Sequence, residues 1–278
     1  MKKKRGRKEM RLGINDNLGH KNPAEWIALV RKYRVRAAVV PMTKDDSEEV
    51  KREYLRLADE EDIIIGEVGI WKNVMAPDET ERKAAVAYAK EQLAFADEIG
   101  ARCCVNISGA AGEVWDGYYE ENYSQETYEK IIDTTREIID SVKPRRTFFT
   151  LEPMYWMHPD SPDDYLKMLK DIDRERFAVH MDYANMITSF SRYHHCDAFI
   201  EECFHKLGPY VKSVHAKDVA FDQRPTVCIR EALPGTGKVD FKQVMRLADE
   251  IDRDMPVFVE HLSSLEEYEK AMSYLQSL

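Results

Sequence analysis

Short apolar segments and longer amphipathic segments alternate from one end of the chain to the other. This alternation is typical of repeated βα units, in which a buried strand is followed by a helix that packs on a parallel sheet. Most of the apolar segments are short and rich in Val, Ile or Phe, as expected of strands covered on both faces. Eight strands are predicted, at residues 12–14, 37–40, 63–68, 102–107, 147–151, 177–181, 211–214 and 256–259.

Helical signals lie between these strands. In the segment 78–99, apolar residues recur near helical spacing, and Gly100 follows as a stop signal. Ser47, Ser161 and Ser264 are suited to cap helices that run to residues 59, 169 and 275.

The length and the number of units favour one closed barrel. The chain has 278 residues, close to the roughly 250 typical of a (β/α)8 TIM barrel. We therefore expect a single α/β domain, a (β/α)8 TIM barrel, over residues 11–278, preceded by a disordered basic tail at 1–10. A doubly wound open sheet is the alternative, but the sequence has no dinucleotide-binding fingerprint to support it.

Charge and composition exclude several classes of function. A formal net charge of −10 repels polyanions, so nucleic acid is not expected as a partner. No apolar stretch reaches the roughly 18 to 20 residues that cross a bilayer, and the mean hydropathy is −0.55. The five cysteines include no CxxC pair, so neither a disulfide framework nor a thiolate metal site is indicated. A cytoplasmic protein is expected, and homo-oligomer formation is left open.

The residues at which the last four strands end form a pattern. In a βα barrel the active site lies at the carboxyl ends of the strands. Here those ends carry Glu152, Asp182, His215 and Glu260. Three carboxylates that converge on one rim would repel one another without a cation between them. A hard, oxygen-rich set with one imidazole suits Mn²⁺ first, with Mg²⁺, Co²⁺ or Zn²⁺ as alternatives.

Several motifs resemble those of the xylose isomerase-like barrel superfamily of sugar-phosphate isomerases and epimerases. They are LEP at 151–153, HMDYAN at 180–185, SVHAKD at 213–218 and FVEHL at 258–262. The resemblance implies that Glu152, Asp182, His215 and Glu260 hold one divalent metal. It also implies that Glu152 and Glu260 move a proton beside the carbonyl of a sugar or polyol, through a metal-stabilised enediolate.

One position departs from the pattern of the ketose epimerases. They often carry a substrate-contacting histidine three residues after the metal-binding aspartate, whereas this chain has Asn185. Asparagine can donate a hydrogen bond but cannot titrate, so the substrate or the division of roles differs. Other strand-end and loop residues are candidates to contact the substrate. The full set of predicted substrate-binding residues is Glu67, Trp71, Asn106, His180, Asn185 and Lys217.

Other functions are compatible with the same barrel. The first alternative is a dehydratase or lyase that acts on a keto-sugar or keto-inositol, including the type that cleaves C-glycosides. An abasic-site endonuclease of the superfamily needs further histidines on the early strands, where this chain has Asn15, Glu67 and Asn106. A catalytically silent ligand-binding barrel is the third. In the late segment PGTGKVDF at 234–241 the glycines predict a turn, with a phosphate cradle as the less favoured interpretation.

Overall fold

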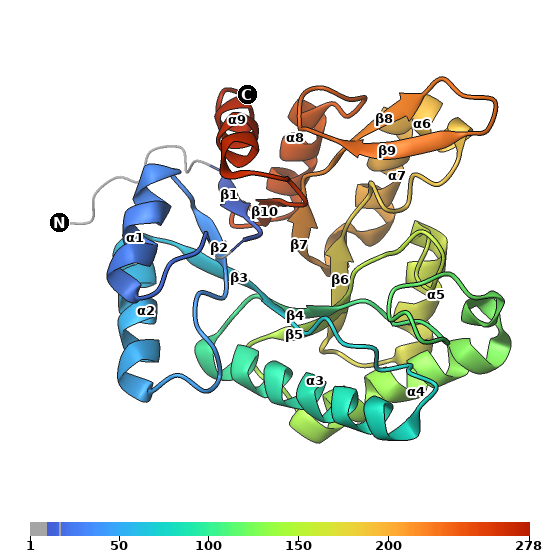
Figure 1. Ribbon diagram of the computed structural model, residues 1–278, viewed down its shortest axis with the longest axis horizontal. Coiled ribbons are helices and arrows are strands. Elements are labelled where there is room, and N and C mark those ends of the chain that lie inside the picture. The colour runs from blue at the N-terminus through green and yellow to red at the C-terminus, as the bar shows by residue number, and fades with distance from the viewer. Residues whose placement is uncertain (1–9, 17) are drawn as a thin grey trace.

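Eight parallel strands close into a barrel in which every strand pairs with two neighbours (Figure 1). The structure is a computed structural model that describes residues 10–16 and 18–278. Around the barrel the strands follow the order β1-β10-β7-β6-β5-β4-β3-β2. They are β1 Arg11–Ile14, β2 Ala37–Val39, β3 Ile64–Gly69, β4 Cys103–Asn106, β5 Phe148–Leu151, β6 Phe177–Met181, β7 Val211–His215 and β10 Pro256–Val259.

The expected (β/α)8 TIM barrel is thereby confirmed. Residues 1–9 of the expected basic tail lie outside the described residues. The boundary at residue 11 therefore stays a prediction.

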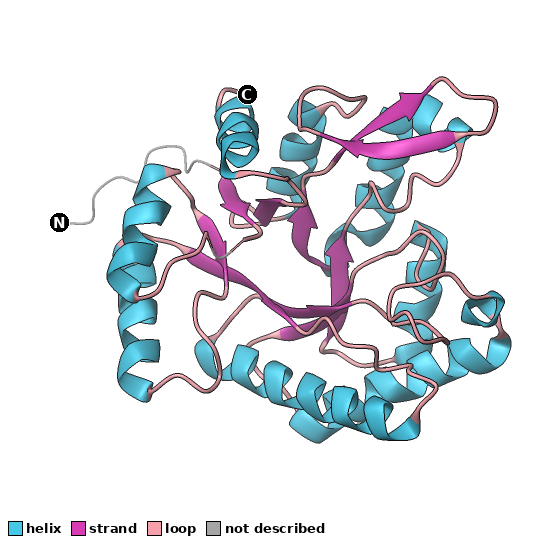
Figure 2. Ribbon diagram, in the orientation of Figure 1, coloured by secondary structure: helices cyan, strands magenta, loops and turns pink. Residues whose placement is uncertain are grey.

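Helices surround the barrel and cover the outer faces of its strands (Figure 2). The predicted caps at Ser47, Ser161 and Ser264 each accept a hydrogen bond from a backbone N–H in the first turn. The longer helices are α1 Pro23–Lys32, α2 Glu48–Glu60, α3 Glu79–Ile99, α4 Gln125–Val142, α5 Pro162–Ile172, α7 Cys196–Leu207, α8 Phe241–Ile251 and α9 Leu265–Gln276. The short ones are η1 Glu120–Tyr123, α6 Phe190–His194 and η2 Gly208–Tyr210. Within the described residues, no helix combines the length and apolar character needed to span a membrane.

One aromatic ring fills the interior of the barrel below its mouth. Phe258 of β10 is fully buried, and its ring lies against the backbone of Gly13 in β1 and Gly66 in β3. A Cβ at Gly13 would lie 2.5 Å from this ring, and one at Gly66 would lie 2.6 Å from it, so no larger residue fits at either position. Residues two apart on a strand share a face, which places the side chain of Glu260 above that of Phe258.

An antiparallel hairpin, which the sequence analysis did not predict, extends from the mouth between β7 and α8 (Figure 1). It consists of β8 Asp218–Asp222 and β9 Cys228–Ala232. The two oxygens of the Asp218 carboxylate accept hydrogen bonds from the backbone N–H groups of Val219, Gly235, Gly237 and Val239, at 2.8–3.0 Å. The glycine-rich loop therefore donates to an aspartate of the chain itself, and it forms the turn that the glycines predict.

Candidate functional site

Four neighbouring strands deliver one polar cluster to the mouth of the barrel. Glu152 follows β5, Asp182 follows β6, His215 ends β7 and Glu260 follows β10. One donor atom from each side chain lies within 4.8 Å of the others, and all four residues are buried. The four side chains predicted as metal ligands are therefore close enough to hold one ion.

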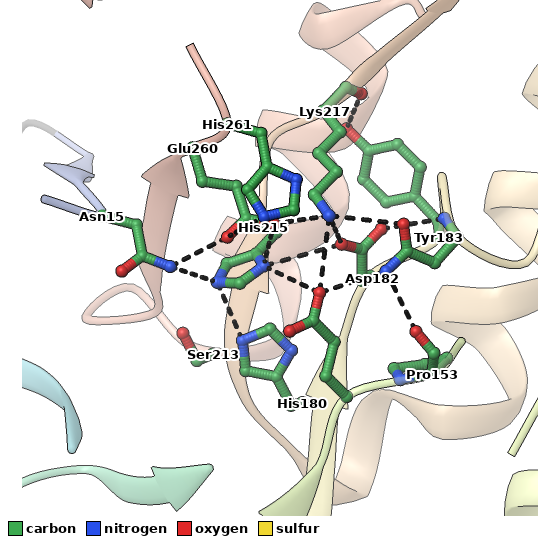
Figure 3. A network of polar contacts seen from close by, with 12 residues as sticks. Asn15, Pro153, His180, Asp182, Tyr183, Ser213, His215, Lys217, Glu260 and His261 are labelled. Carbon is green, nitrogen blue, oxygen red and sulfur yellow. Dashed lines mark hydrogen bonds and ion pairs between the residues drawn. The ribbon is translucent and has the colours of Figure 1, made fainter. Parts of the chain in front are cut away.

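His215 is the centre of this cluster (Figure 3). Its Nδ1 atom lies 2.6 Å from Glu260 Oε1, 3.5 Å from Glu152 Oε1 and 3.5 Å from Asp182 Oδ2. Among the described residues, His215 Nδ1, Asp182 Oδ2 and Glu260 Oε1 are buried and make no hydrogen bond of regular geometry. Asp182 Oδ2 and Glu260 Oε1 contact the ammonium group of Lys217, and His215 Nδ1 contacts Glu260 Oε1. Carboxylates packed this closely repel one another and favour a cation between them. The donor set thus fits a divalent metal ion.

Lys217 brings a positive charge to the same place. Its buried Nζ atom lies 2.7 Å from Asp182 Oδ2, 2.5 Å from Glu260 Oε1 and 3.4 Å from Glu152 Oε1 (Figure 3). One ammonium group cannot balance the three carboxylates of the cluster, so negative charge remains for a cation. The same excess of negative charge favours the protonated form of His215. Burial disfavours the charged imidazole, but Glu260, Glu67 and Glu152 outweigh it and raise the pKa of His215 well above its ordinary value.

Behind His215, a second buried group contains Glu67 and His180, two of the predicted substrate-binding residues. Glu67 Oε2 lies 3.4 Å from His215 Nε2, and Glu67 Oε1 lies 3.1 Å from His180 Nε2. The hydroxyl of Ser213 also donates to Glu67. Burial raises the pKa of Glu67, but His215 and His180 outweigh this effect and lower it. In the neutral imidazole that binds a metal, a proton on Nε2 held by Glu67 would leave the lone pair of His215 Nδ1 free for the ion.

Two asparagines hold the glutamates of the cluster. Asn185 Nδ2 donates to Glu152 Oε1 at 3.1 Å and to the carbonyl of Pro153 at 3.0 Å. Asn15 Nδ2 donates to Glu260 Oε2 at 2.9 Å. Asn185 was among the predicted site residues. Asn15 was considered only as a residue unsuited to a nuclease, although it follows β1 and the rule applied to the last four strands would have identified it.

A group at the rim was also missed by the sequence analysis. Glu231 of β9 lies 3.5 Å from Lys217 Nζ, and its Oε1 accepts a hydrogen bond from Tyr155 at 3.1 Å. The same oxygen lies 3.1 Å from His261 Nδ1, and His261 has a left-handed backbone with φ of 55°. This interaction is the main cause of the raised pKa of His261. Because Glu231 reaches the site through the hairpin, only prediction of the hairpin could have identified it.

A cavity of about 320 Å³ opens beside the cluster. Trp71, predicted to contact substrate, lines it and is 38% exposed. Asn106, another predicted contact, is fully buried and uses its amide for the loop after β3, with hydrogen bonds to the backbone N and O atoms of Lys72 at 3.2 and 3.0 Å. The complete lining is Asn15, Trp71, Ile107, Trp115, Asp116, Glu152, Met154, Tyr155, Asn185, Glu260 and His261.

Solved structures with the same fold include enzymes. The chain superposes with a TM-score of 0.66 on a xylose isomerase-like TIM barrel protein from Mycobacterium smegmatis in complex with magnesium, at 18% identity over 96% of this chain and 95% of that one. The probable 3-DHS dehydratase AsbF from Bacillus anthracis gives 0.72, at 12% identity over 96% and 98%. D-psicose 3-epimerase with D-tagatose from Clostridium cellulolyticum H10 gives 0.69, at 15% identity over 96% and 97%.

These likenesses establish the fold. No curated protein sequence matches the chain. The sequence family described as xylose isomerase-like TIM barrel matches residues 24–278, which is nearly the whole chain. The chain belongs to the xylose isomerase-like TIM barrel family.

Proposed function

We propose that the protein is a divalent-metal-dependent isomerase or epimerase of a sugar or sugar-like polyol. The observation that carries the proposal is the convergence of Glu152, Asp182, His215 and Glu260 at the barrel mouth, where one donor atom of each buried side chain lies within 4.8 Å of the others. The epimerase and the dehydratase among the solved structures of this fold support an enzyme with chemistry of this kind.

The metal would be held by Glu152, Asp182, His215 and Glu260. Their oxygen-rich donor set favours Mn²⁺, with Mg²⁺, Co²⁺ and Zn²⁺ as alternatives. When bound, the ion supplies positive charge that stabilises the negative charge developing on substrate oxygens as a proton leaves the neighbouring carbon.

Glu152 and Glu260 would act as the pair that removes and returns this proton. Asn185 fixes an oxygen of Glu152, and Asn15 fixes an oxygen of Glu260, so both carboxylates are oriented before substrate arrives. A carboxylate held within reach of an acidic C–H bond can serve as general base, and its protonated form as general acid. The ammonium group of Lys217 lies between them and can donate a hydrogen bond to a substrate oxygen.

The cavity beside the cluster suits a small uncharged polyol. Trp71 and Trp115 both line it, and indole rings pack well against the apolar face of a sugar ring. Asp116 adds a further carboxylate to the lining, which disfavours an anionic substrate. We therefore infer that the group bound in this cavity is not phosphorylated.

The test is turnover in deuterated water with Mn²⁺, in a screen of ketoses, keto-inositols and 3-oxo-glycosides. With the substrate that reacts, solvent deuterium should enter the carbon next to the carbonyl. Glu152→Gln and Glu260→Gln should each keep part of the metal affinity and lower turnover by ~10²-fold or more, because glutamine cannot take up the proton. Near-normal turnover in either variant with metal bound, or reaction without solvent exchange, would contradict the proton-transfer role.

A lyase or dehydratase acting on a keto-glycoside is the second candidate, and one observation favours it. A cavity of about 480 Å³ lies under the hairpin, with Trp156, Ile187, Val227 and Ile229 in its lining. Tyr155 lines both this cavity and the one beside the metal cluster. A substrate with an apolar substituent could thus place its sugar at the cluster and the substituent under the hairpin. Release of phenol or of an aromatic C-linked group from a 3-oxo-glycoside would identify this chemistry.

A further inference from the structure

We propose that the opposite end of the barrel contains a binding site for a tetrahedral oxyanion, either inorganic phosphate or the phosphate group of a small metabolite. The site lies where β3, β4, β5 and β7 begin, and it is separate from the proposed active site at the strand ends. A cavity of about 370 Å³ defines it. The lining residues are Ile64, Gly100, Ala101, Arg102, Arg146, Phe148 and Lys212.

Cations gather at this cavity although the chain has a net charge of −10. Arg102, Arg146 and Lys212 line it, and the guanidinium group of Arg176 lies next to it. Lys212 Nζ is 4.4 Å from the centre of the Phe148 ring, and the guanidinium carbon of Arg176 is 4.9 Å from the same centre. One aromatic ring is thus shared by two cations.

Two of these cations have no carboxylate partner. In the described part of the chain, neither Lys212 nor Arg176 forms an ion pair, and each has only its cation–π contact with Phe148. Such a contact is worth about 0.5–1 kcal/mol at an exposed site, less than a charge-assisted hydrogen bond to an anion. Both groups therefore retain the capacity to bind a negative ligand.

The nearby carboxylates are already engaged. Asp252 is paired with Arg102. Asp97 Oδ1 accepts hydrogen bonds from the backbone N–H groups of Arg145, Arg146 and Thr147. The guanidinium of Arg146 donates to the backbone carbonyl of Glu98 at 2.9 Å. Because this carbonyl is uncharged, the positive charge of Arg146 is not neutralised by it. The four cations Arg102, Arg146, Arg176 and Lys212 thus outnumber the carboxylates Asp97 and Asp252, and the cavity keeps net positive charge.

The Lys212 ammonium is also partly removed from water. Burial, and then the positive charge of Arg102, lower the pKa of Lys212; the negative charge of Asp252 opposes this, and Arg176 adds a smaller lowering effect. A half-buried cation surrounded by cations is stabilised by a bound anion more than an exposed lysine is. Two guanidinium groups and an ammonium group around one cavity provide the directed N–H donors that phosphate oxygens accept.

The test is calorimetric titration of the full-length, Mn²⁺-loaded protein with inorganic phosphate, and separately with glucose 6-phosphate, at constant ionic strength. Saturable binding of at least one ligand is expected, whereas chloride should give none. If only the sugar phosphate binds, the source is a phosphorylated metabolite, and if both bind equally, the phosphate group alone is recognised.

Matched variants locate the binding. Lys212→Met keeps the length of the side chain and should weaken phosphate binding about 10-fold, which corresponds to about 1.4 kcal/mol. Lys83→Met removes a lysine that is 72% exposed on α3 and should change nothing. Asp182→Asn, at the mouth, should leave the phosphate affinity unchanged. The proposal is wrong if no saturable binding occurs, if Lys212→Met binds as well as wild type, or if the Asp182 variant loses binding.

Discussion

The two ends of the barrel carry opposite unpaired charges. At the mouth, buried carboxylates outnumber the cations that contact them, whereas at the base neither Lys212 nor Arg176 pairs with a carboxylate of the described residues. Strand β7 contributes to both ends, with Lys212 near its start and His215 at its end. The sign of the charge at each end of the barrel therefore depends on where the charged residues lie along the strands. The acidic composition of the whole chain does not predict the positive charge at the base. Each end is expected to take a ligand of the opposite sign.

The largest effect is expected from removing a charge at the mouth. Asp182→Asn should lower the Mn²⁺ affinity by about 100-fold, at or beyond the upper end of losses seen when outer partners of a metal site are removed. At a free Mn²⁺ concentration 100 times the wild-type Kd, the ion should stabilise wild type by about 2.7 kcal/mol, and most of this should vanish in the variant. Thermal unfolding with and without Mn²⁺ measures this stabilisation in wild type and in the variant.

The control for this variant is Asp249→Asn, which changes an exposed aspartate on α8. It should respond to Mn²⁺ as wild type does. If Mn²⁺ stabilises Asp182→Asn as much as wild type, Asp182 does not bind the ion. The proposed difference in ligand charge between the two ends of the barrel would then be unsupported.

A smaller effect is expected from the interior, between the two ends. Glu67 lies behind His215 and away from the proposed ion, so Glu67→Gln should lower the Mn²⁺ affinity about 10-fold by removing the partner of the His215 Nε2 atom. Ser213→Ala, which removes only a donor to Glu67, should cost less. Calorimetric titration with Mn²⁺ gives both values, and an unchanged affinity in Glu67→Gln would show that Glu67 does not orient the histidine.

The smallest effect is expected at the base, from Asp97. Burial opposes its ionisation, but the backbone N–H groups of Arg146, Thr147 and Arg145 outweigh it and lower the pKa of Asp97. Asp97→Asn should therefore lower the free energy of unfolding by about 1 kcal/mol at pH 7. Because the pKa is lower in the folded state, the contribution is complete above the unfolded value of about 3.9 and is lost as the pH falls through the folded value.

Urea unfolding of wild type and Asp97→Asn at pH 7 and at pH 3 tests this sign. The difference between the two proteins should shrink at pH 3. A constant difference would mean that the charge on Asp97 has no part in holding the loop that leads into β5.

The barrel could be predicted from the sequence because each strand is a separate apolar segment. The predicted ranges 177–181 and 256–259 agree with β6 and β10 at both ends, and the others differ by one residue at one or both ends. The hairpin was missed because its strands are amphipathic and half exposed, so their pattern differs little from that of a polar loop.

Only some of the side chains that come together at the candidate site could be predicted from the sequence. The strand-end rule brought together the four proposed ligands because parallel strands in a closed barrel all end at the same rim. The rule does not specify how deep in the barrel a side chain lies. Glu67 and His180, predicted to bind substrate, lie against each other in the interior, and their contact with substrate stays a prediction. Side-chain depth of this kind depends on the register between strands, which a single sequence does not specify.

Asp218 fixes both ends of the hairpin that β8 and β9 form. Its carboxylate accepts hydrogen bonds from Val219, the second residue of β8, and from Gly235, Gly237 and Val239 beyond the end of β9. One carboxylate thus fixes both ends of the segment between these anchors. The positions of Glu231 and of the apolar wall beneath the hairpin therefore depend on Asp218, which lies outside both cavities.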